Sequence, residues 1–231
     1  MVFSLSGRGL DGPRVPPVSG TAEQLVVFLH GYGSNGDDLI ALARPWAQLL
    51  PKAAFVSPNA PEPVPGAPFG FQWFEITRLD PAAMVRGVER AAPVLNAFLD
   101  SELKRHNLTA ANLALVGFSQ GTMMALHAGL RRPEPVAAIV GYSGLLAGPE
   151  KLETELAAKP PVLLVHGDAD QMIPVSAMHV AAGALAKAGV SVRWHVSRGV
   201  AHGIDQDGVA LGAHFIKDAF AGRQAAPAPA P

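Results

Sequence analysis

Hydrophobic residues along this chain gather in short, nearly uninterrupted runs that alternate with longer segments of helical character. Continuous apolar runs are typical of strands that are buried on both faces of a parallel sheet. The predicted strands are 25–30, 54–57, 113–117, 136–142, 162–166 and 192–196. The predicted helices are 38–49, 82–106, 120–131, 175–188 and 208–220. This alternation predicts an α/β fold in which helices cover both faces of a mostly parallel sheet.

Two segments fit the pattern less simply. Pro93 falls inside the second predicted helix, where proline removes one hydrogen bond, so we expect that helix to be kinked or divided there. Near the start, residues 1–6 and 14–19 are predicted to pair as antiparallel strands, with the turn at residues 12–13.

Two connections between predicted elements also carry information through their length. Residues 59–70 are rich in proline and glycine and run into large aromatic side chains, as loops that border binding sites often do. Residues 144–160 suffice only for a short helix-sized connection. A large cap domain is therefore not expected at that place.

Length and composition predict one domain with a flexible end. The chain has 231 residues, of which 49% are hydrophobic, and we expect a single compact domain over residues 1–222. Residues 223–231 are rich in alanine and proline and carry no pattern that could bury a face. We expect them to form a disordered tail.

Charge and residue usage exclude several classes of function. The 18 basic and 19 acidic side chains nearly balance, so no excess of positive charge is available to bind nucleic acid. No apolar stretch approaches the roughly 20 residues that span a bilayer, so stable membrane insertion is not expected. Cysteine is absent, which excludes disulfides, thiolate zinc sites and cysteine nucleophiles. The first residues lack the pattern of a secretory signal, which predicts a cytoplasmic location.

The strongest chemical signal is the pentapeptide Gly-Phe-Ser-Gln-Gly at residues 117–121. It follows a predicted strand and begins a predicted helix, which is the setting that a nucleophile elbow requires. A sharp turn there holds the serine outward, while glycine at both ends lets strand and helix approach closely. Ser119 is therefore the candidate nucleophile.

A serine hydroxyl needs a neighbouring base, and that base needs an acid to orient it. Of the histidines well beyond Ser119, only His202 falls in a predicted loop, between the last strand and the last helix. Asp168 and Asp170 directly follow the fifth predicted strand. Asp168 stands in the tight turn and can bond local amides, so Asp170 is favoured as the acid. His166 ends that strand ahead of the acid and is set aside as a base.

Acyl transfer places negative charge on a carbonyl oxygen, which backbone amides can stabilise. The amide of Gln120 begins a predicted helix and has no partner within it. A second donor is expected from residues 29–33, Leu-His-Gly-Tyr-Gly. The glycines of this loop could also cradle a phosphate. However, no Lys-Ser or Lys-Thr follows and no acidic residue stands at the expected distance, so nucleotide binding is disfavoured.

Together these motifs resemble the family of small α/β-hydrolases that includes carboxylesterases, phospholipases and acyl-protein thioesterases, close to its bacterial carboxylesterases. The resemblance covers nearly the entire chain and is carried by segments 28–33, 72–74, 117–121, 166–170 and 201–202. It implies an α/β-hydrolase fold with Ser119 as nucleophile, Asp170 as acid and His202 as base. It also implies that the amides of Leu29 and Gln120 form the oxyanion hole.

The resemblance further implies a small-molecule or lipid-like acyl ester as substrate and water as second substrate, with no metal ion and no organic cofactor. Members of the family often form homodimers, which these residues do not decide. An apolar groove for the acyl chain is expected where side chains flank the catalytic loops, at Tyr32, Trp73, Phe74, Met172 and Ile173.

The sequence thus favours a serine carboxylesterase that cleaves short to medium acyl esters through an acyl-enzyme. An acyl-protein thioesterase or a lysophospholipase is the alternative, because groove shape rather than these motifs separates the substrates. A dehalogenase or an epoxide hydrolase would need a carboxylate in place of Ser119. A hydrolase-fold binding protein is the non-enzymatic alternative, but loss of activity normally removes a member of the triad.

Overall fold

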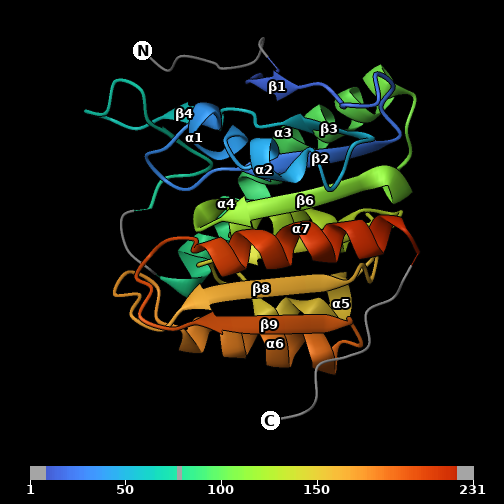
Figure 1. The fold of residues 1–231 in the computed structure, drawn as a ribbon. Coiled ribbons are helices and arrows are strands. Elements are labelled where there is room, and N and C mark those ends of the chain that lie inside the picture. Colours follow the sequence, from blue (N-terminus) through green and yellow to red (C-terminus); the bar gives the residue numbers. More distant parts are fainter. Residues whose placement is uncertain (1–8, 77–79, 223–231) are drawn as a thin grey trace.

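The computed structural model describes residues 9–76 and 80–222 (Figure 1). Within them, seven strands form one sheet in the order β1-β3-β2-β6-β7-β8-β9, and β4 and β5 form a small second sheet. The strands are β1 Arg14–Val15, β2 Gln24–Leu29, β3 Ala53–Val56, β4 Glu62–Pro63, β5 Phe71–Gln72, β6 Leu113–Phe118, β7 Ala138–Tyr142, β8 Val162–Gly167 and β9 Val192–Ser197. The predicted α/β fold with a mostly parallel sheet is confirmed, since only β1 in the large sheet runs antiparallel to its neighbour.

Helices cover both faces of the large sheet. The helices are α1 Gly36–Ile40, α2 Ala43–Trp46, α3 Pro81–His106, α4 Gln120–Arg131, α5 Leu152–Glu155, α6 Ser176–Lys187 and α7 Gln206–Phe220, with 3-10 turns at Ala110–Asn112 and Pro149–Lys151. In Figure 1, α7 crosses the front of the sheet, while α3, α4 and α6 lie behind it. No helix in the described ranges is both long enough and apolar enough to cross a bilayer.

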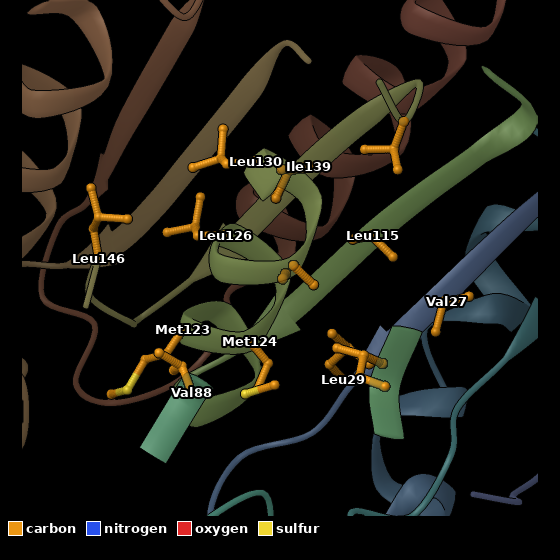
Figure 2. Packing of buried hydrophobic residues seen from close by; sticks show 14 of the residues in the cluster. Val27, Leu29, Val88, Leu115, Met123, Met124, Leu126, Leu130, Ile139 and Leu146 are labelled. Atoms are coloured by element: carbon orange, nitrogen blue, oxygen red, sulfur yellow. The ribbon is translucent and has the colours of Figure 1, made fainter. Parts of the chain in front are cut away.

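The hydrophobic core has two parts because successive side chains of a strand point to opposite faces. In β2, Leu25, Val27 and Leu29 pack on the face covered by α3, α4 and α6. Val26 and Phe28 of the same strand pack on the opposite face with residues of α2 and α7. Figure 2 shows the first cluster, to which Leu29 of β2 and Met124 of α4 both belong. Nearly all these side chains are fully buried, which fixes the sheet between its helices.

Two predicted helices differ from the structure. The predicted division at Pro93 is wrong, because α3 runs through it as one helix of 26 residues. Pro93 is exposed, so the carbonyl that it leaves without a partner can bond water. Residues 38–49 instead form two short helices, because Leu42 and Arg44 donate to carbonyls three residues back and Pro45 has no amide to donate.

The N-terminal part of the described chain also differs from the expected hairpin. The strand expected at 14–19 is limited to Arg14–Val15, and it pairs antiparallel with β3. Its expected partner, residues 1–6, lies outside the described residues, as do the predicted tail at 223–231 and residues 77–79. The segment 144–160 holds only a 3-10 turn and the four-residue α5, so it contains no cap domain.

The long proline- and glycine-rich connection after β3 is more ordered than a plain loop. Its two short strands, β4 and β5, pair antiparallel, and Phe71 also bridges Ser34 in the loop that follows β2. The amide of Gly33 donates to the Phe71 carbonyl at 2.9 Å. These bonds hold the 59–74 segment against the carboxyl end of β2, beside the nucleophile elbow.

Candidate active site

Ser119 lies between β6 and α4, at the carboxyl edge of the sheet. Its backbone has φ 53° and ψ −116°, a left-handed conformation that is strained for a residue with a side chain. The Ser119 amide donates to the carbonyl of Tyr142 in the neighbouring strand at 2.9 Å, which holds the turn in place. This is the geometry of a sharp strand-to-helix elbow that presents a serine at the sheet edge.

Glycine is required on both sides of this elbow by close backbone contacts. A Cβ atom at Gly117 would lie 2.3 Å from the carbonyl oxygen of Gly121. A Cβ atom at Gly121 would lie 1.8 Å from the carbonyl oxygen of Leu29. Neither position can hold a larger residue without moving backbone, so the spacing of the two glycines is a steric requirement of the turn.

The structure brings Asp170 and His202 together from two different loops. The Nδ1 atom of His202 lies 2.7 Å from Oδ2 of Asp170. The other carboxylate oxygen, Oδ1, accepts hydrogen bonds from the amides of Met172 and Ile173, each at 2.9 Å. Burial opposes ionisation of Asp170, but these hydrogen bonds outweigh it and hold the pKa of Asp170 below its usual value. An ionised Asp170 orients His202 with its Nδ1–H toward the carboxylate.

Asp168 has a different partner. Its carboxylate accepts a hydrogen bond from the amide of Gly199 at 2.6 Å, in the turn after β9. It therefore ties two loops together and does not pair with His202. The sequence favoured Asp170 over Asp168 by a turn argument, and in the structure it is Asp170 that contacts His202, while Asp168 contacts Gly199.

The loop that carries His202 is anchored next to the elbow. The His202 ring packs against the ring of Phe118, which directly precedes Ser119, with 5.0 Å between centroids. The hydroxyl of Ser143, at the end of β7, donates to the carbonyl of Gly203 at 3.0 Å. The elbow, the end of β7 and the histidine loop thus meet at one edge of the sheet.

His166 is a buried neighbour of this pair that sequence reasoning set aside. Its Nε2 atom lies 2.8 Å from the carbonyl oxygen of Ile173 and 3.2 Å from Oδ2 of Asp170. The side chain is only 1% exposed. The sequence did contain a signal that His166 lies near the acid, since it stands at the end of the strand that leads into the Asp170 loop, four residues before Asp170.

The aromatic segment at residues 73–74 is held beside the elbow by hydrogen bonds between side chains and backbone groups. The carboxamide of Gln120 accepts from the amide of Trp73 at 2.8 Å and donates to the carbonyl of Phe74 at 2.7 Å. The indole of Trp73 donates to the carbonyl of His30 at 3.0 Å. The fully buried Gln120 side chain therefore fixes the aromatic segment to the first turn of α4.

The hydrogen bonds of His30, whose carbonyl accepts from Trp73, hold its imidazole ring in one neutral tautomer. Its Nε2 accepts a hydrogen bond from the Ala60 amide at 2.9 Å, so the proton is on Nδ1, which lies 2.8 Å from the Gly31 carbonyl oxygen. Burial lowers the pKa of His30. His30 thus acts as an uncharged link between the loop after β2 and the segment after β3.

The five predicted groove residues fall into two groups. Trp73, Phe74 and Ile173 are buried in the core, with at most 4% of each exposed. Tyr32 is 45% exposed and Met172 is 64% exposed, each on a loop at the carboxyl edge of the sheet. Only the last two side chains are accessible from solvent in this conformation.

An apolar groove that sequence reasoning missed lies where α3, α6 and the segment after β7 meet. It has a volume of about 530 Å³ and is lined by the first turns of α3, the loop 145–150 and the start of α6. Its first loop residue, Leu145, follows Gly144, where a Cβ atom would come within 2.8 Å of the Ser119 carbonyl oxygen. A second apolar groove, of about 700 Å³, lies between α2 and α7.

No group of three or more histidine, aspartate or glutamate side chains in the described ranges could hold a metal ion. What the site offers is a half-buried elbow serine, a carboxylate-oriented imidazole and unpaired amides at the start of a helix. An open, mostly parallel sheet with such an elbow defines the α/β-hydrolase class.

The chain belongs to the phospholipase/carboxylesterase family, whose model matches residues 10–219. It is a hydrolase of the carboxylesterase and acyl-protein thioesterase type. It is 32% identical to acyl-protein thioesterase 1 of Schizosaccharomyces pombe over 169 residues, which cover 69% of this chain and 73% of that protein. It is 29% identical to esterase YpfH of Escherichia coli over 185 residues, which cover 80% of this chain and 78% of that protein.

Among solved structures, the chain is similar to the crystal structure of esterase PE8. The two share 49% sequence identity with a TM-score of 0.88, over 91% of this chain and 99% of that one. The carboxylesterase of Bacillus cereus has the same fold, with a TM-score of 0.74 at 18% identity, over 91% of this chain and 94% of that one.

Proposed function

We propose that this protein is a serine carboxylesterase in which Ser119, His202 and Asp170 form the catalytic triad. The observation that carries the proposal is the 2.7 Å contact between His202 Nδ1 and Asp170 Oδ2, on a loop that packs against the elbow of Ser119. With Nδ1–H turned to the carboxylate, the Nε2 lone pair of His202 is free to accept a proton.

In the first half-reaction, Ser119 Oγ forms a bond to the acyl carbon while its proton passes to Nε2 of His202. The resulting tetrahedral intermediate then collapses, the bond to the leaving alcohol breaks, and that alcohol takes the proton from His202. In the second half-reaction, water attacks the acyl carbon and gives a proton to His202. The bond to Ser119 breaks, Ser119 regains the proton, and the free acid leaves.

One oxyanion donor is the backbone amide of Gln120. It is the first amide of α4 and therefore has no partner within the helix. The resemblance assigns the second donor to Leu29. Leu29 is the last residue of β2 and pairs in register with Gly117. The amide of Tyr32 has no acceptor within the described part of the chain, and it follows Gly31, where a Cβ atom would lie 3.2 Å from Cβ of Ser119. We therefore favour the Tyr32 amide over the Leu29 amide.

A crystal structure of the protein with a phosphonate bonded to Ser119 would decide between the two amides. The phosphoryl oxygen stands in for the oxyanion of the tetrahedral intermediate. It should lie about 2.7–3.1 Å from the amide nitrogens of Gln120 and Tyr32. A contact to the amide of Leu29 instead of Tyr32 would show that Leu29, at the end of β2, provides the second donor.

The groove of about 530 Å³ next to Gly144 supports an apolar acyl chain as the substrate group. Its lining is largely alanine, leucine, methionine, valine and proline. Tyr32 and Met172 are exposed at the same edge of the sheet and are proposed to contact the substrate. Trp73, Phe74 and Ile173 are proposed to support the site from the core rather than to touch the substrate.

Labelling with a fluorophosphonate tests the nucleophile. Intact-mass analysis should find one adduct on the wild-type protein and none on the Ser119→Ala variant. The matched control is Ser101→Ala, an exposed serine on α3, which should be labelled like the wild type. The proteins that take the label should also hydrolyse 4-nitrophenyl acetate, and the Ser119→Ala variant should not. An adduct on the Ser119→Ala protein would show that another residue is the nucleophile, and absent turnover would favour a binding protein.

A thioester substrate is the second candidate, because several relatives are named acyl-protein thioesterases. The chemistry at Ser119 is the same for both substrates, so only the leaving group differs. The value of kcat/KM for an octanoyl ester and for an octanoyl thioester of similar size would separate the two readings. A higher value for the sulfur leaving group across several acyl lengths would favour the thioesterase.

A further inference from the structure

The carboxylate of Asp170 faces two imidazole rings at one oxygen. Oδ2 lies 2.7 Å from Nδ1 of His202 and 3.2 Å from Nε2 of His166. We propose that His166 is a positioning residue, whose Nε2–H shares this oxygen with His202, fixes the orientation of the Asp170 carboxylate and reduces its attraction for a protonated His202. The inference rests on the proposed triad, and it adds a fourth side chain to it.

The hydrogen-bond partners of His166 settle which ring atom carries the proton. Its Nε2 lies 2.8 Å from the carbonyl oxygen of Ile173, which can only accept. Nε2 must therefore be a donor, and the same N–H also faces Oδ2 of Asp170. A hydrogen shared between two acceptors is a common arrangement in proteins.

The side chains that line the small space beside His166 carry no charge. The ring borders a small closed space whose other lining is uncharged and includes Thr122 and Leu126 of α4 and Met178 and Ala181 of α6. The rest of its lining is uncharged as well and comes from Gly141, Gly144, Leu145, Leu164 and Val165. A donor fixed in such a dry setting acts strongly on the carboxylate that it faces.

The set of donors around Asp170 defines what His166 contributes. Oδ1 accepts from two backbone amides, and Oδ2 accepts from His202 and His166. Every donor stabilises the negative charge of the carboxylate and so reduces its attraction for a protonated His202. His166 also stops the carboxylate from rotating away from His202. Removal of His166 should therefore let His202 retain its proton to higher pH and weaken its alignment with Ser119.

The test compares His166→Leu with His166→Gln. Glutamine can place a donor near the position of Nε2, whereas leucine cannot donate. We measure kcat and KM for 4-nitrophenyl acetate between pH 5 and pH 9. The acidic limb of kcat/KM should move up by about 0.5 to 1 pH unit in the leucine variant, with kcat lowered about tenfold and KM unchanged. The glutamine variant should restore both values to near those of the wild type.

The matched control is His195→Leu, on the neighbouring strand β9, where His195 pairs in register with Val165. It should leave the pH profile unchanged. A folded His166→Leu protein with the wild-type profile would overturn the proposal, because a merely structural role would lower stability without moving the acidic limb. If the leucine variant does not fold, the glutamine variant decides, since a shifted acidic limb there contradicts the proposed donor.

A measurement on the wild-type protein is independent of all variants. Long-range nitrogen–proton NMR correlations report which ring nitrogen of His166 is protonated, and we expect Nε2–H. An Nδ1–H form with a bare Nε2 cannot donate to Asp170 and would refute the proposal. Failure of the proposed triad would look different, because the phosphonate label and ester turnover would then be absent from the wild type itself.

Discussion

The side-chain oxygen of Gln120 accepts a hydrogen bond from the backbone amide of Trp73 at 2.8 Å, across 47 positions of sequence. The same carboxamide donates to the carbonyl of Phe74 at 2.7 Å. One side chain next to the candidate nucleophile thus satisfies two buried backbone groups of a distant segment. Because its own amide is a candidate oxyanion donor, Gln120 connects the shape of that segment to the chemistry at Ser119.

Replacement of Gln120 by methionine should therefore destabilise the protein more than a lost surface contact would. Methionine keeps the length of the side chain but leaves the Trp73 amide and the Phe74 carbonyl unpaired in the core. Each unpaired buried group costs about 1–3 kcal/mol. We expect the free energy of unfolding, measured with urea, to fall by about 2–6 kcal/mol in total. Gln48→Met, at an exposed position, is the control and should change it little.

The two carboxylates of the loop after β8 provide a matched pair for testing the acid. Asp170→Asn should lower kcat by about a factor of 10³ to 10⁴, because the amide side chain favours the wrong tautomer of His202. Asp168→Asn should keep kcat within a few-fold of the wild type, since Asp168 bonds the Gly199 amide instead. Steady-state kinetics on both variants provides the comparison. Equal losses in the two variants would contradict the assignment of Asp170.

Much of the fold could be predicted because buried strands in a parallel sheet read as continuous apolar runs. Residues 25–30 and 162–166 were predicted as strands within one residue of β2 and β8. Helix ends were harder, because local chemistry decides them. Pro93 was expected to kink or divide α3, but the helix continues through it, and Pro93 lies on the exposed side, where water can satisfy the carbonyl it leaves unpaired.

The candidate site could be predicted only as far as motifs reach. The elbow and its two glycines lie within five residues, so their spacing in the sequence is enough to predict the shape of the turn. The contact between Gln120 and Trp73 depends on how distant segments pack, and no local pattern encodes it. His166 was missed for a related reason, because a strand residue was judged by its position rather than by its neighbours. The apolar groove likewise exists only after α3, α6 and the loop after β7 come together.

The groove next to Gly144 predicts a dependence of rate on acyl length. Each additional methylene buried contributes about 0.8 kcal/mol, so kcat/KM should rise about three- to fourfold per methylene until the groove is full. Ala177→Trp places a large side chain in the groove and should lower kcat/KM for the octanoate ester about tenfold or more, with little change for the acetate. The measurement is a series of 4-nitrophenyl esters from acetate to decanoate.

Ala210→Trp is the control for this prediction, because Ala210 lines the other apolar groove, between α2 and α7. It should not change the preference for acyl length. Should Ala210→Trp rather than Ala177→Trp remove the preference for long chains, the acyl chain would have to occupy the groove beside α7.

Stability below neutral pH should depend on His127, a buried residue of α4 that the proposed reaction does not use. Its Nδ1 atom has no hydrogen-bond partner within the described residues. Burial, with a further contribution from Arg131, lowers the pKa of His127 from 6.5 to about 4. The unfolded chain therefore takes up a proton near pH 6.5, whereas the folded protein resists protonation until near pH 4. The stabilisation is present above pH 6.5 and is lost as the pH falls toward 4.

One unit of pKa difference corresponds to about 1.4 kcal/mol, so this single group should remove up to about 3 kcal/mol of stability between pH 6.5 and pH 4. Urea unfolding at pH 7 and at pH 4 measures the loss. His127→Gln cannot take up the proton, so its loss of stability should be smaller than that of the wild type by about 2–3 kcal/mol. His214→Gln, at an exposed position on α7, should lose as much as the wild type. If His127→Gln and the wild type lose stability equally, the proton uptake on unfolding belongs to other groups.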